Sequence, residues 1–251
     1  MTTTTTDALS PAPATTDAAG LTETRAAAGD PSRAGQSGQT AQMQTRERLL
    51  EAAGQVFAEQ GFRRATVRQI CTRAGANIAA VNYHFGDKMG LYAAVINHWL
   101  GVAREKYPPD LGLGPDPTPE ERLHAYVRSY LFRLLGQGAP AWHGRLMAQE
   151  MIEPTEVMDT LLAQTIRPMI QRLESIVRDL LGAGATDEQV RACTSSIAGQ
   201  CCFYRHAEAL LTRLYPEHGT SPAQIERLAD HVTRFSLQGL RCYGADCREK
   251  Q

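Results

Sequence analysis

The stretch Thr66–Lys88, TVRQICTRAGANIAAVNYHFGDK, decides the fold of this chain. Thr66 begins a T-x-x-Q capping box, which is typical of a helix start. Gly75 can end this short helix, because glycine adopts the left-handed conformation at little steric cost. Asn77 is suited to cap a second helix, Ile78–His84. A helix, a glycine turn and a second helix form a helix-turn-helix, a unit whose second helix enters the DNA major groove.

The same stretch resembles the signature of the TetR family of bacterial transcriptional regulators. The resemblance is carried by Thr66, Ile70…Ala74-Gly75, Tyr83-His84-Phe85 and Lys88…Leu91. It continues upstream into TRERLLEAAGQVFAEQGF and covers the chain from Thr45 to about Trp99. The segment NIAAVNYHFGDKMGLY is similar to the CecR/CerR-type branch. The larger C-terminal part resembles that branch through weaker motifs. The resemblance implies a ligand-responsive regulator, a repressor, that binds a palindromic DNA operator as a homodimer.

By motif position, the resemblance implies that Ile78, Ala80 and Asn82 face the groove, while Tyr83, His84 and Lys88 contact the DNA backbone. An asparagine can pair bidentately with adenine, and lysine and arginine meet phosphates. An ordinary three-helix scaffold, with these aromatic residues in its core, is the alternative reading. The predicted DNA-binding residues are Thr66, Arg68, Asn77, Ile78, Ala80, Asn82, Tyr83, His84 and Lys88.

The distribution of charge also favours DNA contact by the helix-turn-helix end of the chain. The formal net charge of the 251 residues is −1, but residues 44–92 hold seven Lys or Arg and four Asp or Glu, a net charge of +3. Residues 1–43 carry −2. The positive charge therefore lies with the helix-turn-helix, where phosphates would be met.

Three regions are expected: a disordered tail at 1–42, a helix-turn-helix domain at 43–92, and a helical ligand-binding and dimerisation domain at 93–251. The tail is rich in Thr, Ala, Gly and Pro and has no aromatic residue, so it cannot bury enough surface to order itself. An arm that follows the DNA backbone is the alternative. No apolar run approaches the roughly 18 residues that span a bilayer. We expect a cytoplasmic bacterial protein with reduced cysteines.

An all-α fold is predicted, because no strand pattern of period two occurs. Pro168 should kink or split one long helix, and Asp187 should cap the next. Thr118-Pro119 and Ser221-Pro222 are strong helix starts. Besides the two helices of the central stretch, helices are expected at 44–60, 88–106, 119–135, 141–152, 155–181, 187–214 and 222–243.

The helices after residue 118 carry many aromatic and methionine side chains with a few polar groups between them. Such a mixture is typical of a small-molecule pocket, although the same residues could simply fill a core. A constitutive DNA-binding dimer without an effector pocket is therefore a rival hypothesis. The predicted ligand-binding residues are Tyr130, Trp142, Met147, Glu150, Met151, Met169, Phe203 and His206.

The last two long helices each carry an apolar stripe and a second apolar edge, which favours a four-helix bundle formed by two chains. The predicted interface residues are Ile197, Cys201, Tyr204, Val232, Phe235 and Gly239.

Sensing by thiols or metal is a weaker hypothesis. Cys202 and His206 lie four residues apart, but Cys201 and Cys202 point about 100° apart on a helix and no Cys-x2-Cys pair occurs. No catalytic motif is present, so we expect no enzyme activity, no cofactor and no metal.

Overall fold

The computed structural model describes residues 31–136, 140–217 and 219–249. The chain divides into two units, residues 1–40 and residues 41–251. The predicted tail falls outside the described residues as far as residue 30. Residues 31–42 form the beginning of helix α1 (Pro31–Arg64), so this helix starts upstream of the predicted Gln44. Gly61 leaves helical geometry, with φ 76° and ψ 161°, at the point where the helix was expected to end.

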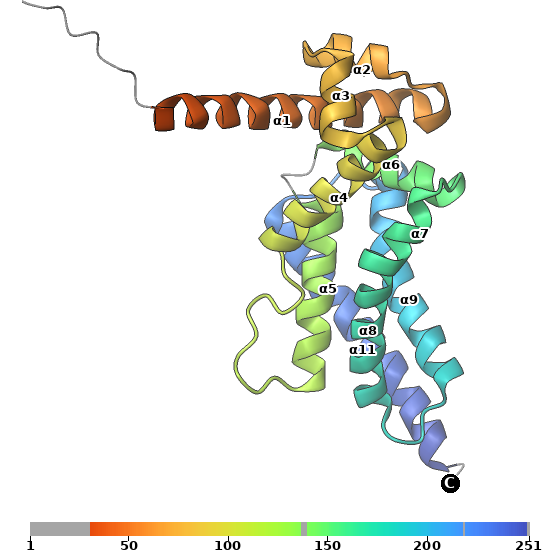
Figure 1. The fold of residues 1–251 in the computed structure, drawn as a ribbon. Coiled ribbons are helices and arrows are strands. Elements are labelled where there is room, and N and C mark those ends of the chain that lie inside the picture. The colour runs from red at the N-terminus through yellow and green to blue at the C-terminus, as the bar shows by residue number, and fades with distance from the viewer. Residues whose placement is uncertain (1–30, 137–139, 218, 250–251) are drawn as a thin grey trace, which may run out of the picture. The chain divides into compact units, whose positions relative to one another are not determined.

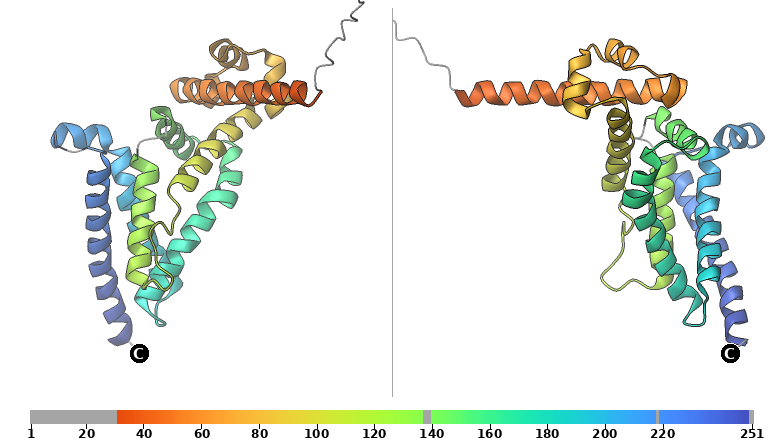
Figure 2. Two further views of the ribbon diagram at one scale, coloured as in Figure 1. Left: turned by 90° about the vertical axis from the view of Figure 1, so that its left-hand side faces the viewer. Right: turned by 45° about the vertical axis from the view of Figure 1, so that its right-hand side comes forward.

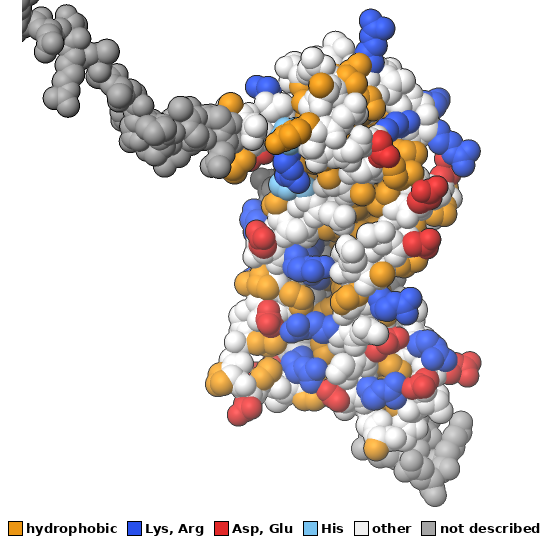
Figure 3. Space-filling model, in the orientation of Figure 1, with side chains coloured by type: hydrophobic (Ala, Val, Ile, Leu, Met, Phe, Trp, Pro, Cys, Tyr) orange, Lys and Arg blue, Asp and Glu red, His pale blue; other side chains and the backbone are white. Residues whose placement is uncertain are grey.

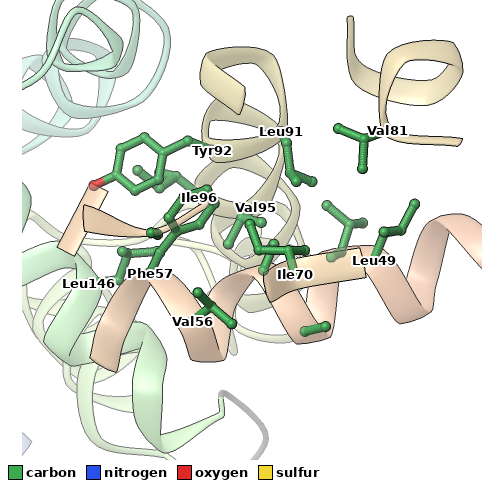
Figure 4. Close-up of a cluster of buried hydrophobic side chains, with 14 of the residues drawn as sticks. Leu49, Val56, Phe57, Ile70, Val81, Leu91, Tyr92, Val95, Ile96 and Leu146 are labelled. Carbon is green, nitrogen blue, oxygen red and sulfur yellow. The ribbon is translucent and has the colours of Figure 1, made fainter. Parts of the chain in front are cut away.

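Three further helices complete the predicted DNA-binding part: α2 (Val67–Ala74), α3 (Ile78–Phe85) and α4 (Lys88–Lys106). Their apolar faces meet α1 in one core. Figure 4 shows Leu49 and Phe57 of α1 with Val81 of α3 and Tyr92 of α4 in this cluster. Leu146, from a helix more than forty residues further along the chain, lies in the same core beside Phe57.

The larger domain begins with α5, where Thr118 and Glu121 form the predicted capping box and Pro119 occupies the first turn. Ser221 and Gln224 cap the last helix in the same way. No strand occurs in the described part of the chain, and the prediction of an all-α fold is confirmed. The remaining elements are α5 (Pro119–Leu135), α6 (Ala141–Ile152), α7 (Val157–Leu161), the π-helical turn η1 (Leu162–Ile166), α8 (Arg167–Leu181), α9 (Asp187–His206), α10 (Glu208–Leu214) and α11 (Pro222–Glu249).

Two of the predicted long helices are interrupted. Pro168 lies at the start of α8, and the π-turn η1 precedes it, because the wider turn accommodates a residue that cannot donate a helical hydrogen bond. The helix predicted to end at Leu214 breaks at Ala207 into α9 and α10. Its cap is Thr186 rather than the predicted Asp187, since the Thr186 hydroxyl accepts the Gln189 amide.

Helices α5, α8, α9 and α11 pack around a second core, and α5 lies against each of the other three (Figure 1). Both views in Figure 2 show these helices running lengthwise beside one another. Within the described residues, no helix combines the length and the apolar character needed to cross a membrane.

Candidate functional site

Capping hydrogen bonds set the geometry of the turn between α2 and α3. The Thr66 hydroxyl accepts the Gln69 amide at 3.3 Å, and the Gln69 side chain accepts the Thr66 amide at 2.9 Å. Gly75 adopts the left-handed conformation, with φ 60° and ψ 41°. The Asn77 side chain then accepts the amide of Ala79 at 3.0 Å. The predicted turn is therefore present, and the side-chain oxygens of Thr66 and Asn77 serve as helix caps within it.

Helix α3 turns one face to solvent and the other to the first core. Val81 is fully buried in that core. Ile78 and Asn82 are exposed and stand one turn apart, so they share a face. Tyr83 is 73 % exposed and His84 lies against its ring, with 4.9 Å between the ring centres. The exposed side chains of this face can approach a flat or grooved partner.

Ala80 differs from its predicted position. It is half-buried and packs against the first core, because it lies beside Val81 on the inner side of α3. Ala79 is exposed in its place, one turn before Tyr83. Ala79 was not among the predicted contact residues, although the spacing of the buried Val81 on a helix could have identified it.

Cationic side chains surround α3, and Figure 3 shows Lys and Arg side chains around the α1–α3 end of the molecule. The Lys88 amine donates to the Arg63 carbonyl at 3.3 Å and lies 4.5 Å from the centre of the Phe62 ring. Burial lowers the pKa of Lys88. An ammonium has three N–H donors, so this contact leaves donors for a phosphate.

The other arginines of this region differ in how they are paired. Arg68 is exposed on α2. Arg73 makes two hydrogen bonds to Glu59, at 2.8 and 3.0 Å, so its charge is neutralised within the chain. Arg46 lies over the ring of Phe85, 5.6 Å from its centre, directly beside the end of α3. Arg46 is thus a further candidate for phosphate contact that the motif did not indicate.

Several side chains of helix α6 contact the helices of the predicted DNA-binding part. The Trp142 indole donates to Glu51 of α1 at 3.0 Å. The Gln149 amide donates to the carbonyl of Ala58 at 3.2 Å. Met147 packs against the first core. Trp142 and Met147 were predicted to bind ligand, but the structure places them in the contact between α6 and the DNA-binding helices.

Glu150 is the most buried acidic side chain of this contact, at 1 % exposure. One carboxylate oxygen accepts the Tyr92 hydroxyl of α4 at 2.7 Å. The other accepts the amide and hydroxyl of Thr155, at 2.8 and 3.0 Å. Both oxygens are therefore engaged within the chain, and Glu150 joins α4 to α6 instead of lining an open pocket.

Comparison with known proteins gives matches over both parts of the chain. Residues 49–95 match the family model described as bacterial regulatory proteins, tetR family, and residues 119–240 match the C-terminal domain of the HTH-type transcriptional dual regulator CecR. The HTH-type transcriptional repressor NicS of Pseudomonas putida is 36 % identical over 208 residues, which cover 78 % of this chain and 92 % of that protein. The chain belongs to the TetR family of bacterial transcriptional regulators.

Within the TetR family, the match of residues 119–240 to the CecR C-terminal domain supports the CecR-type branch. CecR of Shigella flexneri is 28 % identical over 173 residues, covering 64 % of this chain and 76 % of that protein. The structure of FadR from Bacillus subtilis, solved in complex with stearoyl-CoA, superimposes with a TM-score of 0.57 at 16 % identity, over 77 % of this chain and 98 % of that chain. This last likeness shows the shared fold. TetR-family proteins are DNA-binding regulators, which confirms the expectation that the chain is no enzyme.

In this TetR-family chain, two of the predicted ligand-binding residues meet between α5 and α8. Tyr130 of α5 and Met169 of α8 are half-buried, and the guanidinium of Arg133 lies against both. The Tyr130 hydroxyl is 3.1 Å from the sulfur of Cys202. Arg133 was not among the predicted residues, because its spacing on α5 does not reveal that it points inward.

Three other predicted ligand-binding residues lie on the surface. Met151 is 60 % and Phe203 52 % exposed, and His206 is exposed as well. They do not line an interior site of this chain. A cavity of about 330 Å³ lies elsewhere, between the loop after α4 and the helices α5 and α8. It is lined by Pro109, Asp110, Leu113, Gly114, Pro117, Arg122, Arg172 and Ile176.

The predicted interface residues differ in how far they are buried. Ile197, Cys201 and Val232 are buried in the second core, so they contact their own chain and not a partner. Tyr204 is half-buried. Phe235, at 65 % exposure, and Gly239 are exposed. Further exposed apolar side chains on and beside α10 and α11, which the stripes did not indicate, are Leu210, Leu214, Tyr215 and Tyr243.

Cys71, Cys193 and Cys201 are buried, and burial raises the pKa of the Cys201 thiol to about 12. In the described part of the chain, no group of three His, Cys, Asp or Glu side chains is arranged to hold a metal ion.

Proposed function

We propose that this TetR-family protein is a ligand-responsive repressor that binds an inverted-repeat DNA operator as a homodimer and leaves it when a small molecule binds the helical domain. The observation that carries the proposal is the pairing of an exposed face on α3 with hydrogen bonds that tie α6 to α1 and α4. The first feature supports DNA recognition. The second supports control of that recognition from the larger domain.

In the proposed complex, α3 lies in the major groove. Ile78 and Asn82 approach base edges, with the small side chain of Ala79 allowing a close fit. Arg46, Arg68 and Lys88 meet phosphates on either side, together with the backbone contacts expected for Tyr83 and His84. Two such helices must lie about 34–36 Å apart to occupy successive major grooves on one side of the duplex.

The homodimer is supported by exposed apolar side chains on α9, α10 and α11. Phe203, Leu214 and Phe235 are each more than half exposed in a single chain. Exposed apolar side chains that gather into one patch commonly mark an interface. We assign this surface to a second copy of the chain, because an inverted repeat requires two copies related by a two-fold axis.

Control by the effector follows from the position of α6. An effector that binds the state in which α6 and α4 are displaced shifts the population away from the spacing that fits DNA. The rival, a constitutive dimer, lacks such a response. Movement of α6 would be transmitted through Trp142 and Glu150, whose partners lie on α1 and α4.

Selection of double-stranded DNA from a randomised library by the full-length protein tests the proposal. We expect an enriched inverted repeat whose half-site centres are one helical turn apart. Enrichment of a single half-site, or of nothing, contradicts the dimeric operator. The selected DNA then serves in a binding assay with a metabolite library, in which an effector lowers the affinity. A reporter gene carrying the same DNA distinguishes a repressor from an activator by the sign of its response.

A further inference from the structure

Arg133 on α5 has no carboxylate partner among the residues that the structure describes, although it is half-buried. Two other arginines of the same helix are paired. Arg122 donates to Asp179 at 2.6 Å, and Arg128 binds Glu226 through three hydrogen bonds of 2.6 to 2.9 Å. The contrast within one helix sets Arg133 apart.

The surroundings of Arg133 offer it only weak acceptors. Its Nη2 atom is 4.0 Å from the sulfur of Met169, and its Cζ atom is 5.7 Å from the centre of the Tyr130 ring. The Tyr126 hydroxyl donates to the Met169 carbonyl at 3.1 Å, so that oxygen is already engaged. A guanidinium has five N–H donors in a planar fork, and a thioether is a poor acceptor for them.

Like charges lie close to Arg133. Burial lowers the pKa of Arg133; the phenols of Tyr126 and Tyr130 oppose this shift, and the charges of Arg104 and Arg172 add to it. Arg172 is 3.7 Å from Asp110, a looser pair than those of the other α5 arginines. Arg172 and Asp110 also line the cavity between the loop after α4 and the helices α5 and α8, so one of these neighbouring cations borders open space. Figure 3 shows several Lys and Arg side chains on the face over α5 and α8.

A cation removed from water without a partner is unfavourable, and repulsion from two further cations adds to the cost. An anion placed against the guanidinium fork would remove both penalties. The walls around the fork are the aromatic rings of Tyr126 and Tyr130 and the side chain of Met169, which suit an apolar body. A planar carboxylate matches the fork with two parallel hydrogen bonds.

We infer that Arg133 binds the carboxylate of an organic acid whose apolar body packs against Tyr130, Tyr126 and Met169. This inference rests on the proposed function, because it names the chemical class of the effector. Arg104 and Arg172 attract the anion through their charge, whereas Arg133 supplies the directional hydrogen bonds.

The first test needs no ligand. Arg133→Met and Arg128→Met are compared in the full-length protein by thermal unfolding, with circular dichroism as a check of helix content. We expect Arg133→Met to keep or raise the Tm, because it removes an unpaired charge, and Arg128→Met to lower it, because it leaves Glu226 without its partner. If both substitutions lower the Tm equally, Arg133 is a structural residue and the inference is overturned.

The second test uses octanoate, decanoate, benzoate and phenylacetate at millimolar concentration, each beside its uncharged amide, with inorganic phosphate as a further probe. For at least one carboxylate we expect the Tm of the wild type to rise by roughly 3–6 °C at about ten times its Kd, with a much smaller rise for the matched amide. Arg133→Gln should abolish this rise, whereas Arg122→Gln should retain it.

The outcomes separate this inference from the proposed function. The carboxylate site is overturned if no carboxylate raises the Tm of the wild type, or if the amides or inorganic phosphate raise it equally. It is also overturned if the rise is undiminished in Arg133→Gln. The selected DNA is then added. Carboxylate binding that leaves DNA affinity unchanged supports the site but contradicts the ligand-responsive function. Release of DNA by a neutral compound, independent of Arg133, supports the function and overturns the site.

Discussion

The phenol of Tyr92 donates a 2.7 Å hydrogen bond to the carboxylate of Glu150, and both side chains are buried. Tyr92 belongs to α4, the helix that directly follows the helix-turn-helix, and Glu150 belongs to α6. Burial and this hydrogen bond together raise the pKa of the Tyr92 phenol. Because the same carboxylate also binds Thr155, one buried acid connects α4, α6 and the segment before α7.

Tyr92→Phe removes the donor and keeps the ring. We expect the free energy of unfolding to fall by about 1.5–3 kcal/mol, because a buried carboxylate loses a charge-assisted hydrogen bond. Denaturant unfolding measures this loss. Tyr83→Phe is the control, since Tyr83 is largely exposed and its loss should change stability little. Equal stability of Tyr92→Phe and the wild type would show that the bond contributes nothing to the folded state.

Gly54 of α1 lies directly under the ring of Trp142, so a Cβ atom at position 54 would overlap the ring. Gly54→Ala should improve helix propensity by about 0.5–1 kcal/mol. We nevertheless expect a net destabilisation of about 1–3 kcal/mol, because α6 must shift and Trp142 must lose its bond to Glu51. The double variant Gly54→Ala/Trp142→Leu should be more stable than the sum of the single changes predicts. Additive effects would contradict a direct contact.

Buried His143 should make stability depend on pH. Burial, with a further contribution from the charge of Arg205, lowers the pKa of His143 from 6.5 to about 4. Between these values the unfolded chain binds a proton that the folded chain does not, so stability is lost as the pH falls. The loss at pH 5 should be about 2 kcal/mol relative to neutral pH.

Thermal unfolding at pH 7 and pH 5 measures how much stability the wild type and each variant lose over this interval. His143→Leu should lose less stability than the wild type over this interval. The control is His231→Gln, because His231 is exposed on α11 and its removal should leave the pH dependence unchanged. An identical dependence in His143→Leu and the wild type would assign the effect to other groups.

Local signals in the sequence predicted the fold well. The capping boxes at Thr66 and Thr118 and the left-handed Gly75 were predicted because each depends on residues within one helical turn. The cap at Thr186 was missed, since the adjacent Asp187 is an equally suitable capping residue by type. The break at Ala207 has no glycine or proline at that position, and the sequence offers no local reason for it.

Placement of the site residues depended on contacts that are distant in sequence. Nothing near Glu150 indicates that its partner is Tyr92, 58 residues earlier. The stripe containing Ile197 and Cys201 has the same spacing whether its own chain or a second chain covers it, and the structure shows that its own chain does. Arg133 was missed for the same reason, because inward and outward arginines look alike in sequence.

Contacts to phosphate and to bases should respond differently to substitution. Lys88→Ala should weaken binding to all DNA sequences and reduce the slope of log K against log salt by about one. Asn82→Ala should change the preference among operator variants, because its exposed amide can pair with a base edge. Fluorescence anisotropy at several salt concentrations measures both effects.

Lys88 also contacts Arg63 and Phe62 within the chain, so its removal needs a structural control. Lys88→Arg keeps the charge and should largely restore the salt dependence. Lys88→Ala with unchanged affinity and salt slope would show that the amine serves the fold alone. A uniform loss of affinity in Asn82→Ala, without any change in sequence preference, would move this residue to the backbone contacts.

The exposed ring of Phe235 tests the assembly of the protein. Phe235 is 65 % exposed on α11, and Phe203, Leu210 and Leu214 are also exposed on α9 and α10. In a homodimer that covers Phe235, the change Phe235→Glu buries an unpaired charge at a cost of several kcal/mol. Because the side chain is exposed in one chain, the fold of each monomer should survive. Light scattering should give twice the chain mass of 27.5 kDa for the wild type and a value near 27.5 kDa for the variant. DNA affinity should fall as well, since two half-sites must be held together.

Phe235→Leu keeps the apolar contact and should remain dimeric. A monomeric wild type would refute both the homodimer and the inverted repeat, whereas a dimeric Phe235→Glu variant would place the interface on another surface of the chain.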